Sequence, residues 1–550
     1  MISNSQIADA FLLLSKLMEI HGENPFKAKA YSSAAFALEK LPLPVADIPA
    51  EQLTSYKGIG KSAAKKITEM LQTGSMQQLN NLIQATPPGV LEMLHIKGLG
   101  PKKIATIWKE MGIESVGELL YACQENRLLL YKGFGEKTQQ TVRENIEYYL
   151  HNQGLFLYAE AEPFANEMQA LLLQQFPNEK FVLTGAFRRQ LEIIDRLEWV
   201  TTVLPDALEH FLVAGGYEVV EKQPGLLYLK HSGGIMLQFH CCSATQFGSV
   251  LFSTSASEDF LKAWGQVPAD AADEATLFHA KGIAVIPPFL RETFPVAVHE
   301  NLIQPNSIRG IIHSHSNWSD GNNSIEEMAQ ACLERGLEYL VISDHSQSAG
   351  YANGLTVERI REQHRQIDAL NARLHPFRIF KSIEADILGD GRLDYSDEIL
   401  AWFDLVIASV HSNLRMTEEK AMQRLLAAIQ NPFTTILGHM TGRLLLSRPG
   451  YPVNHEQIIE ACVAYDVAIE LNAHPRRLDI DWRWLPTAIH KGAYISINPD
   501  AHDLSGFDDT RYGVLVAQKG NVPAHKNLSS MSLQEFENWL RSVKEKKKRL

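Results

Sequence analysis

Two histidines spaced two residues apart stand at the end of an apolar run in this chain of 550 residues. His313 and His315 close the stretch GIIHSH, and Asp320 follows in the sequence SDG. Imidazole nitrogens and carboxylate oxygens are common ligands of divalent metal ions. Side chains two apart on a strand point to the same face, so both imidazoles should reach one ion. The stretch predicts a metal site at the end of a buried strand.

Further potential ligands recur where later apolar runs end. Six of seven such runs finish on His, Asp or Glu. So many buried acids and imidazoles would leave several groups unpaired without a cation. A cluster of two or three ions is expected, with Glu384 as the bridge because a carboxylate has two oxygens. The ligands besides the first three are His345, Glu384, His411, His439, Asp500 and His502.

This set of ligands also indicates a reaction. It contains imidazole and carboxylate but no thiolate, which favours Mn²⁺, Zn²⁺ or Fe²⁺ over a closed structural zinc site. Clustered divalent ions activate a water and hold the oxygens of a phosphate in line, so phosphate-ester hydrolysis is predicted. Arg443 in TGRLLLSRPGY, and Arg476 with Arg477 in NAHPRRLD, lie after the fifth and sixth runs. They are expected to bind an anionic substrate, and surface ion pairing is the alternative.

A parallel sheet would bring these residues together. From residue 309, seven strand-like runs alternate with segments of helical periodicity. This alternation predicts a parallel α/β barrel at 309–520, in which all C-terminal strand ends open onto one face. A connector is placed at 301–308. A C-terminal helix and a basic tail, VKEKKKRL, fall in 521–550, and the tail is expected to fray.

The first 150 residues have a helical pattern with one local form repeated three times. SYKGIGKSAAKKITEML, HIKGLGPKKIATIWKEM and YKGFGEKTQQTVRENI each contain a Gly-X-Gly turn followed by a lysine-bearing helix. Free N–H groups and lysines at a helix start can hold a phosphate. Gly-X-Gly can also simply close a helical hairpin, but three copies favour helix-hairpin-helix units that bind a nucleic-acid backbone. The residues expected to contact DNA are Gly58, Gly60, Lys61, Gly98, Gly100, Lys102, Lys103, Gly133, Gly135 and Lys137.

Length and composition limit the class of protein to which the chain can belong. The length indicates several domains, and the formal charge of -12 excludes a uniformly basic surface. The five cysteines form no CxxC pair, and no apolar run reaches the roughly 20 residues that span a bilayer. We expect a cytoplasmic monomer with no membrane segment. Short strand-like runs such as KFVLTGAF and GIMLQFHC predict an α+β region between 151 and 300.

The C-terminal motifs resemble those of a known domain. HSHSNWSDG, ISDHS, IEADIL, SVHS, GHMTGRLLL and ISINPDAH are similar to the successive motifs of the polymerase-and-histidinol-phosphatase (PHP) domain. The resemblance implies a distorted seven-stranded barrel with a trinuclear metal site. It implies three ligand sets: His313, His315, Glu384 and Asp500; Asp320, His345 and His502; and Glu384, His411 and His439.

The rest of the chain resembles the bacterial family X DNA polymerases. HGENPFKAKAYSSAAFALEKLP and the hairpins are similar to their lyase and fingers regions, and IPPFLRE is similar to the end of their thumb. This implies a lyase-like domain at 1–80, fingers at 81–150, a nucleotidyltransferase-like palm at 151–245 and a thumb at 246–300. It also implies that Lys66 is a Schiff-base lysine for abasic sites, with a phosphate clamp as the alternative.

The palm departs from the family pattern. Family palms carry GSFRRGKETVGDIDIL and a later VDLR, whose three aspartates hold two magnesium ions, but this chain has GAFRRQLEIIDRLEWV. The aspartate positions fall on Arg196, Glu198 and Gln238. Asp195 lies one residue away, which on a strand would turn it to the opposite face. Because an arginine would repel the cations, we expect no polymerase activity.

These features predict a metal-dependent enzyme that processes DNA ends in DNA repair. The resemblance implies 3′-5′ exonuclease, abasic-site endonuclease or 3′-phosphatase activity of the PHP domain on gapped, recessed or abasic duplexes. One alternative is an active gap-filling family X polymerase with a PHP exonuclease. Another is a nonenzymatic DNA-binding scaffold.

Overall fold

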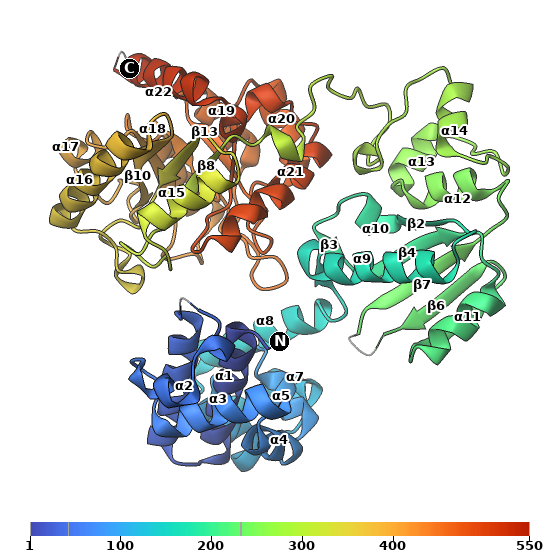
Figure 1. Ribbon diagram of the computed structural model, residues 1–550, viewed down its shortest axis with the longest axis horizontal. Helices are drawn as coiled ribbons and strands as arrows, with labels where there is room; N and C mark the ends of the chain where they lie inside the picture. The colour runs from blue at the N-terminus through green and yellow to red at the C-terminus, as the bar shows by residue number, and fades with distance from the viewer. Residues whose placement is uncertain (1, 42, 232–233, 549–550) are drawn as a thin grey trace. The chain divides into compact units, whose positions relative to one another are not determined.

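The protein forms two compact units, Met1–Gln153 and Gly154–Leu550. The computed structural model describes residues 2–41, 43–231 and 234–548 (Figure 1). No helix in these ranges is long and apolar enough to cross a membrane.

The first unit is helical, as the sequence predicts. Its apolar helix faces form one core that includes Phe11, Tyr31, Ile67 and Ile104. The helices are α1 (Asn4–His21), α2 (Pro25–Glu39), α3 (Lys61–Thr73), α4 (Gln77–Gln84), α5 (Pro88–Met93), α6 (Pro101–Ala105), α7 (Val116–Gln124) and α8 (Glu136–His151).

The three Gly-X-Gly turns share one backbone geometry. The first glycine of each turn has a positive φ: 100° at Gly58, 86° at Gly98 and 95° at Gly133. This left-handed region favours glycine. The second glycine is the N-cap of α3, α6 or α8, with φ of -81°, -81° and -82° and no side-chain cap. The N–H groups of each first turn therefore lack a capping side chain.

A mixed five-stranded sheet lies in the second unit, in the region where the resemblance implies a palm. Its order is β2-β4-β7-β6-β5, and only the β4–β7 pair is parallel. The helices α9 (Tyr158–Gln175) and α11 (Pro205–Ala214) share the apolar core with it. The strands are β2 (Phe181–Thr184), β4 (Arg196–Thr201), β5 (Glu218–Gln223), β6 (Leu226–Lys230) and β7 (Met236–Cys241). The short strands β1 (Phe156–Leu157) and β3 (Ile193–Ile194) pair separately.

Three helices follow the palm where the resemblance implies a thumb. They gather around an aromatic cluster of Phe252, Phe260, Trp264 and Phe278. They are α12 (Phe247–Thr254), α13 (Glu258–Trp264) and α14 (Glu274–Ala280).

The seven predicted strands of the C-terminal part are all present and form one parallel sheet in chain order. A bridge between Ser314 and Ala501 joins the two ends of the sheet, which makes a nearly closed barrel. Most strand residues are buried, as expected when helices cover the outside of a parallel sheet. The strands are β8 (Gly310–Ser314), β9 (Tyr339–Ile342), β10 (Arg378–Asp386), β11 (Leu405–Ser409), β12 (Ile436–Leu437), β13 (Ala468–Asn472) and β14 (Ile495–Asn498).

Helices surround these strands (Figure 1). The main ones are α15 (Ile325–Glu334), α16 (Val357–Leu374), α18 (Glu418–Gln430), α19 (His455–Ala464), α20 (Leu485–His490) and α21 (Thr510–Lys519).

The prediction of a frayed tail is wrong for the residues before Arg549. Helix α22 (Leu533–Lys547) buries Phe536, Leu540 and Val543 because these apolar residues share one helix face. The ring of Phe536 stacks on Tyr339 at the start of β9, with centroids 4.9 Å apart. The helix therefore covers the end of the barrel opposite the predicted ligands. Arg549 and Leu550 lie outside the described residues.

Candidate metal centre

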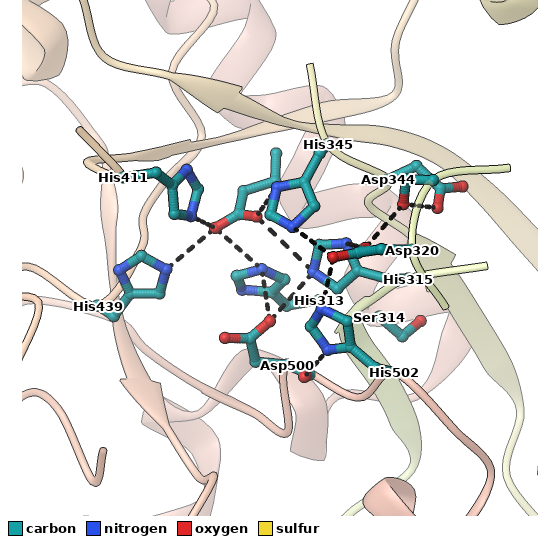
Figure 2. A network of polar contacts seen from close by, with 12 residues as sticks. His313, Ser314, His315, Asp320, Asp344, His345, His411, His439, Asp500 and His502 are labelled. Carbon is teal, nitrogen blue, oxygen red and sulfur yellow. Dashed lines mark hydrogen bonds and ion pairs between the residues drawn. The ribbon is translucent and has the colours of Figure 1, made fainter. Parts of the chain in front are cut away.

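The structure brings all nine predicted ligands to the C-terminal rim of the barrel (Figure 2). His313 lies in β8 and Glu384 in β10, and the other seven lie in the segments that follow β8, β9, β11, β12 and β14. Most are buried, whereas Asp320 and His502 are half-exposed. Segments that are far apart in the sequence thus converge because parallel strands end at the same rim.

Glu384 lies at the centre of this group. Its Oε1 is 3.0 Å from Nε2 of His439, 3.1 Å from Nε2 of His411 and 3.3 Å from Nε2 of His313. Its Oε2 is 3.0 Å from Nδ1 of His345. Imidazoles face both oxygens of one carboxylate, and this arrangement suits a carboxylate that bridges two ions.

Three overlapping groups of side chains could each hold an ion. Their ligand atoms lie within 4.8 Å of one another in each group. The groups match the sets implied by the resemblance in outline, but His345 stands beside Glu384 and His411 where the resemblance implies His439. The groups are His315, Asp320, His345 and His502; His313, His315 and Asp500; and His345, Glu384 and His411.

Several buried atoms of the cluster make no hydrogen bond. They include Nε2 of His313, Nδ1 of His315 and Oε2 of Glu384. Leaving a buried polar atom unpaired costs about 1–3 kcal/mol. A divalent cation would satisfy these atoms at once, so the residues present fit a metal cluster.

The electrostatics of the cluster also suit cations. Burial raises the pKa of Glu384, but the imidazoles of His411, His313 and His345 outweigh burial and hold this pKa well below its usual value. Burial, with the imidazoles of His502 and His345, lowers the pKa of His315 to about 3. An ionised carboxylate and a neutral imidazole are the forms that bind metal. Burial lowers the pKa of His313, His411 and His502, but nearby carboxylates outweigh burial and raise it, so these imidazoles would release a proton on binding an ion.

His313 and His315 converge for a different reason than strand alternation, so that expectation is wrong. The pairing of β8 with β9 shifts register between Ile311 and Ser314. His313 has a φ of 64°, in the left-handed region. The two imidazole rings then lie 5.3 Å apart. Asp500 has a φ of 53°, and such backbone conformations tend to gather at functional sites.

Two carboxylates that hold the ligands were not predicted. Glu470, fully buried in β13, lies with Oε2 2.6 Å from Nδ1 of His313 and accepts from the backbone N–H of His439. Asp386, at the end of β10, contacts Nδ1 of His411. Such contacts fix the tautomer and orientation of a metal-binding imidazole. The acid within the apolar run VAIELNA was the available signal for Glu470.

Asp344 fixes the loop that carries Asp320. Its buried carboxylate accepts from the backbone N–H and hydroxyl of Ser316, at 2.8 and 2.6 Å, and from the Ser319 hydroxyl. Gln363 donates to the same carboxylate at 2.6 Å. Asp344 therefore positions the loop and is not a ligand.

The three arginines differ in the ion pairs and hydrogen bonds that they make. The guanidinium of Arg443 pairs with Asp481 at 2.7 Å and donates to the carbonyls of Arg477 and Leu478. Arg476 pairs with Glu160. Arg477 lies 3.4 Å from Oδ2 of Asp500, next to the cluster. The predicted role of Arg443 at the phosphate remains a prediction, and the geometry favours Arg477 for it.

Comparisons with known proteins agree with this organisation. Models of a helix-hairpin-helix domain, a SAM-like helix-hairpin-helix tandem and a PHP domain match residues 2–76, 90–147 and 312–474. The "DNA polymerase/3'-5' exonuclease PolX" of Bacillus subtilis is 34% identical over 557 aligned residues, covering 95% of this chain and 97% of that protein. The chain belongs to the bacterial PolX family.

Shorter relatives match part of the chain. A "probable phosphatase" of Caldicellulosiruptor saccharolyticus is 26% identical over 231 residues, which cover 40% of this chain and 90% of that protein. Another, from Caldanaerobacter subterraneus subsp. tengcongensis, is 29% identical over 160 residues, or 27% of this chain and 56% of that protein. Together with the PHP match, these relatives indicate that this PolX-family chain is an enzyme.

The three residues at the expected aspartate positions of the palm lie on adjacent strands, β4 and β7. Glu198 in β4 pairs across the sheet with Gln238 in β7. Arg196 donates to Oε1 of Gln238 at 3.2 Å, and Oε2 of Glu198 lies 3.1 Å from Nε2 of His240. These side chains therefore serve as hydrogen-bond partners for one another.

Asp195 does not face away from Arg196, so that expectation is wrong. It lines the same cavity of about 520 Å³ as Arg196 and Glu198 and pairs with Arg196 at 2.7 Å. Strand β3 ends at Ile194 and β4 begins at Arg196, so the alternation of an unbroken strand does not hold there.

Lys66 of the lyase-like region is half-buried in α3. Its Nζ lies 5.8 Å from the ring centroid of Tyr31. Burial lowers its pKa, and Lys27 acts in the same direction while Glu69 opposes it. A lowered amine pKa suits a Schiff-base nucleophile, and a phosphate contact remains the alternative.

Proposed function

We propose that this PolX-family chain hydrolyses phosphate esters at DNA ends, with the metal centre of the barrel as its active site. The observation that carries the proposal is the Glu384 carboxylate, which has imidazoles at both oxygens. The buried ligand atoms without hydrogen bonds support it further. A scaffold would have no need for this arrangement, whose unpaired groups destabilise the fold in the absence of cations.

Each group of the centre has a distinct task in this reaction. Glu384 and the surrounding imidazoles hold divalent ions, and Glu470 and Asp386 fix the imidazoles of His313 and His411. Bound ions supply charge neutralisation on the phosphate and lower the pKa of the attacking water. Arg477 is placed to bind a non-bridging phosphate oxygen.

The DNA substrate is proposed from the first unit. Its three glycine turns present uncapped helix starts, and Lys61 and Lys137 lie exposed beside them. The Bacillus subtilis relative is named as a 3'-5' exonuclease, which supports DNA ends as the substrate. We include recessed, gapped and abasic duplexes, a cytoplasmic repair role, a monomeric state and Mn²⁺, Zn²⁺ or Fe²⁺ in the proposal.

We further propose that the palm has lost polymerase activity. The guanidinium of Arg196 stands where a metal-binding carboxylate is needed, and Glu198 is engaged by His240. The competing function is gap-filling synthesis, favoured by the relative's name. Primer extension on gapped DNA with Mg²⁺ separates them, because incorporation that depends on Glu198 would overturn this part of the proposal.

The main test compares end-labelled recessed, gapped and abasic duplexes with Mn²⁺. The wild type should release nucleotide, phosphate or cleaved product from at least one of them. The double variant His313→Ala with His315→Ala should lose at least ~100-fold in rate, since removing even a supporting residue costs about 10–100-fold. His364→Ala, which removes a histidine outside the cluster, is the matched control. A wild type without activity on every end with Mn²⁺, Zn²⁺ or Fe²⁺ would refute the proposal.

A further inference from the structure

A second cavity opens beside the metal centre, between the segments that follow β12 and β13. Its volume is about 310 Å³, at the lower end of small-ligand pockets. The side chains that matter here are Thr441, Tyr451, His455, Asp479, Asp481 and Trp484. None of them belongs to the predicted metal ligands.

Two buried polar atoms of this cavity lack partners. Asp479 is fully buried, and its Oδ2 accepts from the backbone N–H and hydroxyl of Thr441 at 2.9 and 2.8 Å. Its Oδ1 has no hydrogen bond, and neither does the hydroxyl of Tyr451, a residue that is 6% exposed. Burial raises the pKa of Tyr451, so this hydroxyl keeps its proton. Two residues that line the cavity thus have unmet hydrogen-bonding capacity, one as an acceptor and one as a donor, and buried groups of this kind are normally paired.

Two stacked aromatic side chains line the cavity. The imidazole of His455 stacks on Trp484, with ring centroids 4.7 Å apart and planes 5° apart. Burial lowers the pKa of His455, which keeps the imidazole neutral at neutral pH. Asp481 also lines the cavity and is paired with Arg443. A flat, uncharged ring with adjacent hydrogen-bond donor and acceptor groups would complement these side chains.

The cavity and the metal centre are joined through named contacts. Thr441 follows His439 by two residues. Asn472 donates its backbone N–H to the carbonyl of Asp479 at 2.6 Å and its side-chain amide to Oδ2 of Asp500 at 3.1 Å. A ligand in the cavity would therefore lie next to a phosphate held at the metal centre and Arg477.

We propose that this cavity binds the unpaired nucleobase of the nucleotide at the DNA end, with Asp479 accepting a base N–H and Tyr451 donating to the base. The proposal rests on the proposed function of the metal centre. Adenine, guanine, cytosine and thymine all carry a donor and an acceptor side by side on the pairing edge. The site therefore detects that a base is present rather than which base it is. Because a paired base hides that edge, the bound nucleotide must be unpaired.

Binding to the full chain tests the cavity directly. We would titrate the four deoxynucleoside 5′-monophosphates and, as the probe without a base, 2-deoxyribose 5-phosphate in calorimetry with a chelator present. The nucleotides should bind at least tenfold more tightly than the sugar phosphate. Tyr451→Phe should remove about two- to tenfold of that difference, as expected for one hydrogen bond. Tyr494→Phe, the same change beside Trp539 and Lys526 at the start of β14, should not alter binding. Equal binding of both probes, or a Tyr451→Phe protein that binds as the wild type does, would overturn the proposal.

Kinetics separate a failure of the cavity from a failure of the active site. Tyr451→Phe should raise KM for an unpaired 3′ terminal nucleotide two- to tenfold while leaving KM for an abasic 3′ end unchanged. A variant whose KM changes equally for both kinds of 3′ end would contradict base binding and leave the nuclease proposal intact. Nucleotide binding in a protein that cleaves no DNA would refute the nuclease instead. Asp479→Asn, which keeps an oxygen for Thr441, should repeat the KM result.

Discussion

His313 lies between two carboxylates, with Nδ1 2.6 Å from Oε2 of Glu470 and Nε2 3.3 Å from Oε1 of Glu384. The first contact places a proton on Nδ1, so Nε2 is the nitrogen that would bind a metal ion. Glu470 also accepts from Asn498 at 2.7 Å and from Asn472 at 3.0 Å. A fully satisfied carboxylate of this kind orients a ligand without being one.

Glu470→Gln should therefore weaken metal binding without unfolding the barrel. The amide keeps the shape of the side chain but removes the negative charge that stabilises the Nδ1–H of His313. We expect Mn²⁺ affinity to fall about 10–100-fold, measured by titration followed by electron paramagnetic resonance. Glu456→Gln, an exposed change on α19 that lies outside the cluster, is the control. Unchanged affinity in Glu470→Gln would show that this contact has no part in metal binding.

The stability of the metal-free protein should fall as pH rises from neutral. Burial lowers the pKa of His411 and His502, but nearby carboxylates outweigh burial and raise these values to about 10 and about 9. Both values exceed the unfolded value near 6.5, so the folded protein holds extra protons. That stabilisation is complete below pH 6.5 and is lost as pH rises through 9 to 10. Melting temperatures of chelator-treated protein between pH 6.5 and 10 measure the effect.

Added Mn²⁺ should reverse this trend, because metal binding displaces these protons and becomes tighter at higher pH. The rise in melting temperature on adding Mn²⁺ should grow between pH 6.5 and 9. His364→Ala should keep both trends, since burial lowers the pKa of His364 to about 4 and leaves it neutral throughout this window. A pH-independent response to Mn²⁺ would indicate that the ions bind elsewhere.

The barrel could be predicted because six of its seven strands combine a buried apolar run with a potential ligand at the end, as in LVIASVH, which ends on His411. The carboxylates that orient the ligands could not be predicted in this way. Glu470 is 157 residues from His313 in sequence, and only the closed sheet brings them together. Asp195 was misjudged because the break between β3 and β4 is a tertiary feature with no sequence signal. Asp479 and Tyr451 likewise depend on how two segments fold over one another.

Carboxylates placed at the two substituted palm positions should restore some polymerase activity. Arg196→Asp with Gln238→Asp would replace the guanidinium and the amide with carboxylates on adjacent strands, facing Glu198. We expect Mg²⁺-dependent nucleotide incorporation that the unchanged protein lacks. This incorporation should be slow, because His240 would still contact Glu198. Primer extension on gapped duplex measures it, and adding Glu198→Ala should abolish the gain. Incorporation by the unchanged protein would contradict the loss of palm activity.

The glycine turns of the first unit should bind only the sugar-phosphate backbone of DNA and make no contact with its bases. Lys61 and Lys137 are exposed at the starts of α3 and α8, next to uncapped N–H groups. Each lysine that contacts a phosphate contributes about 0.9 to the slope of log affinity against log salt concentration. Lys61→Ala with Lys137→Ala should therefore lower that slope by about 2. The double variant should also bind duplexes of different sequence more weakly, and to the same extent for each. Fluorescence anisotropy across a salt series measures this, with Lys491→Ala, a lysine paired to Glu456 and Glu460 in the second unit, as the control. A loss of affinity confined to one sequence, or an unchanged slope, would mean that these lysines do not hold the phosphate backbone.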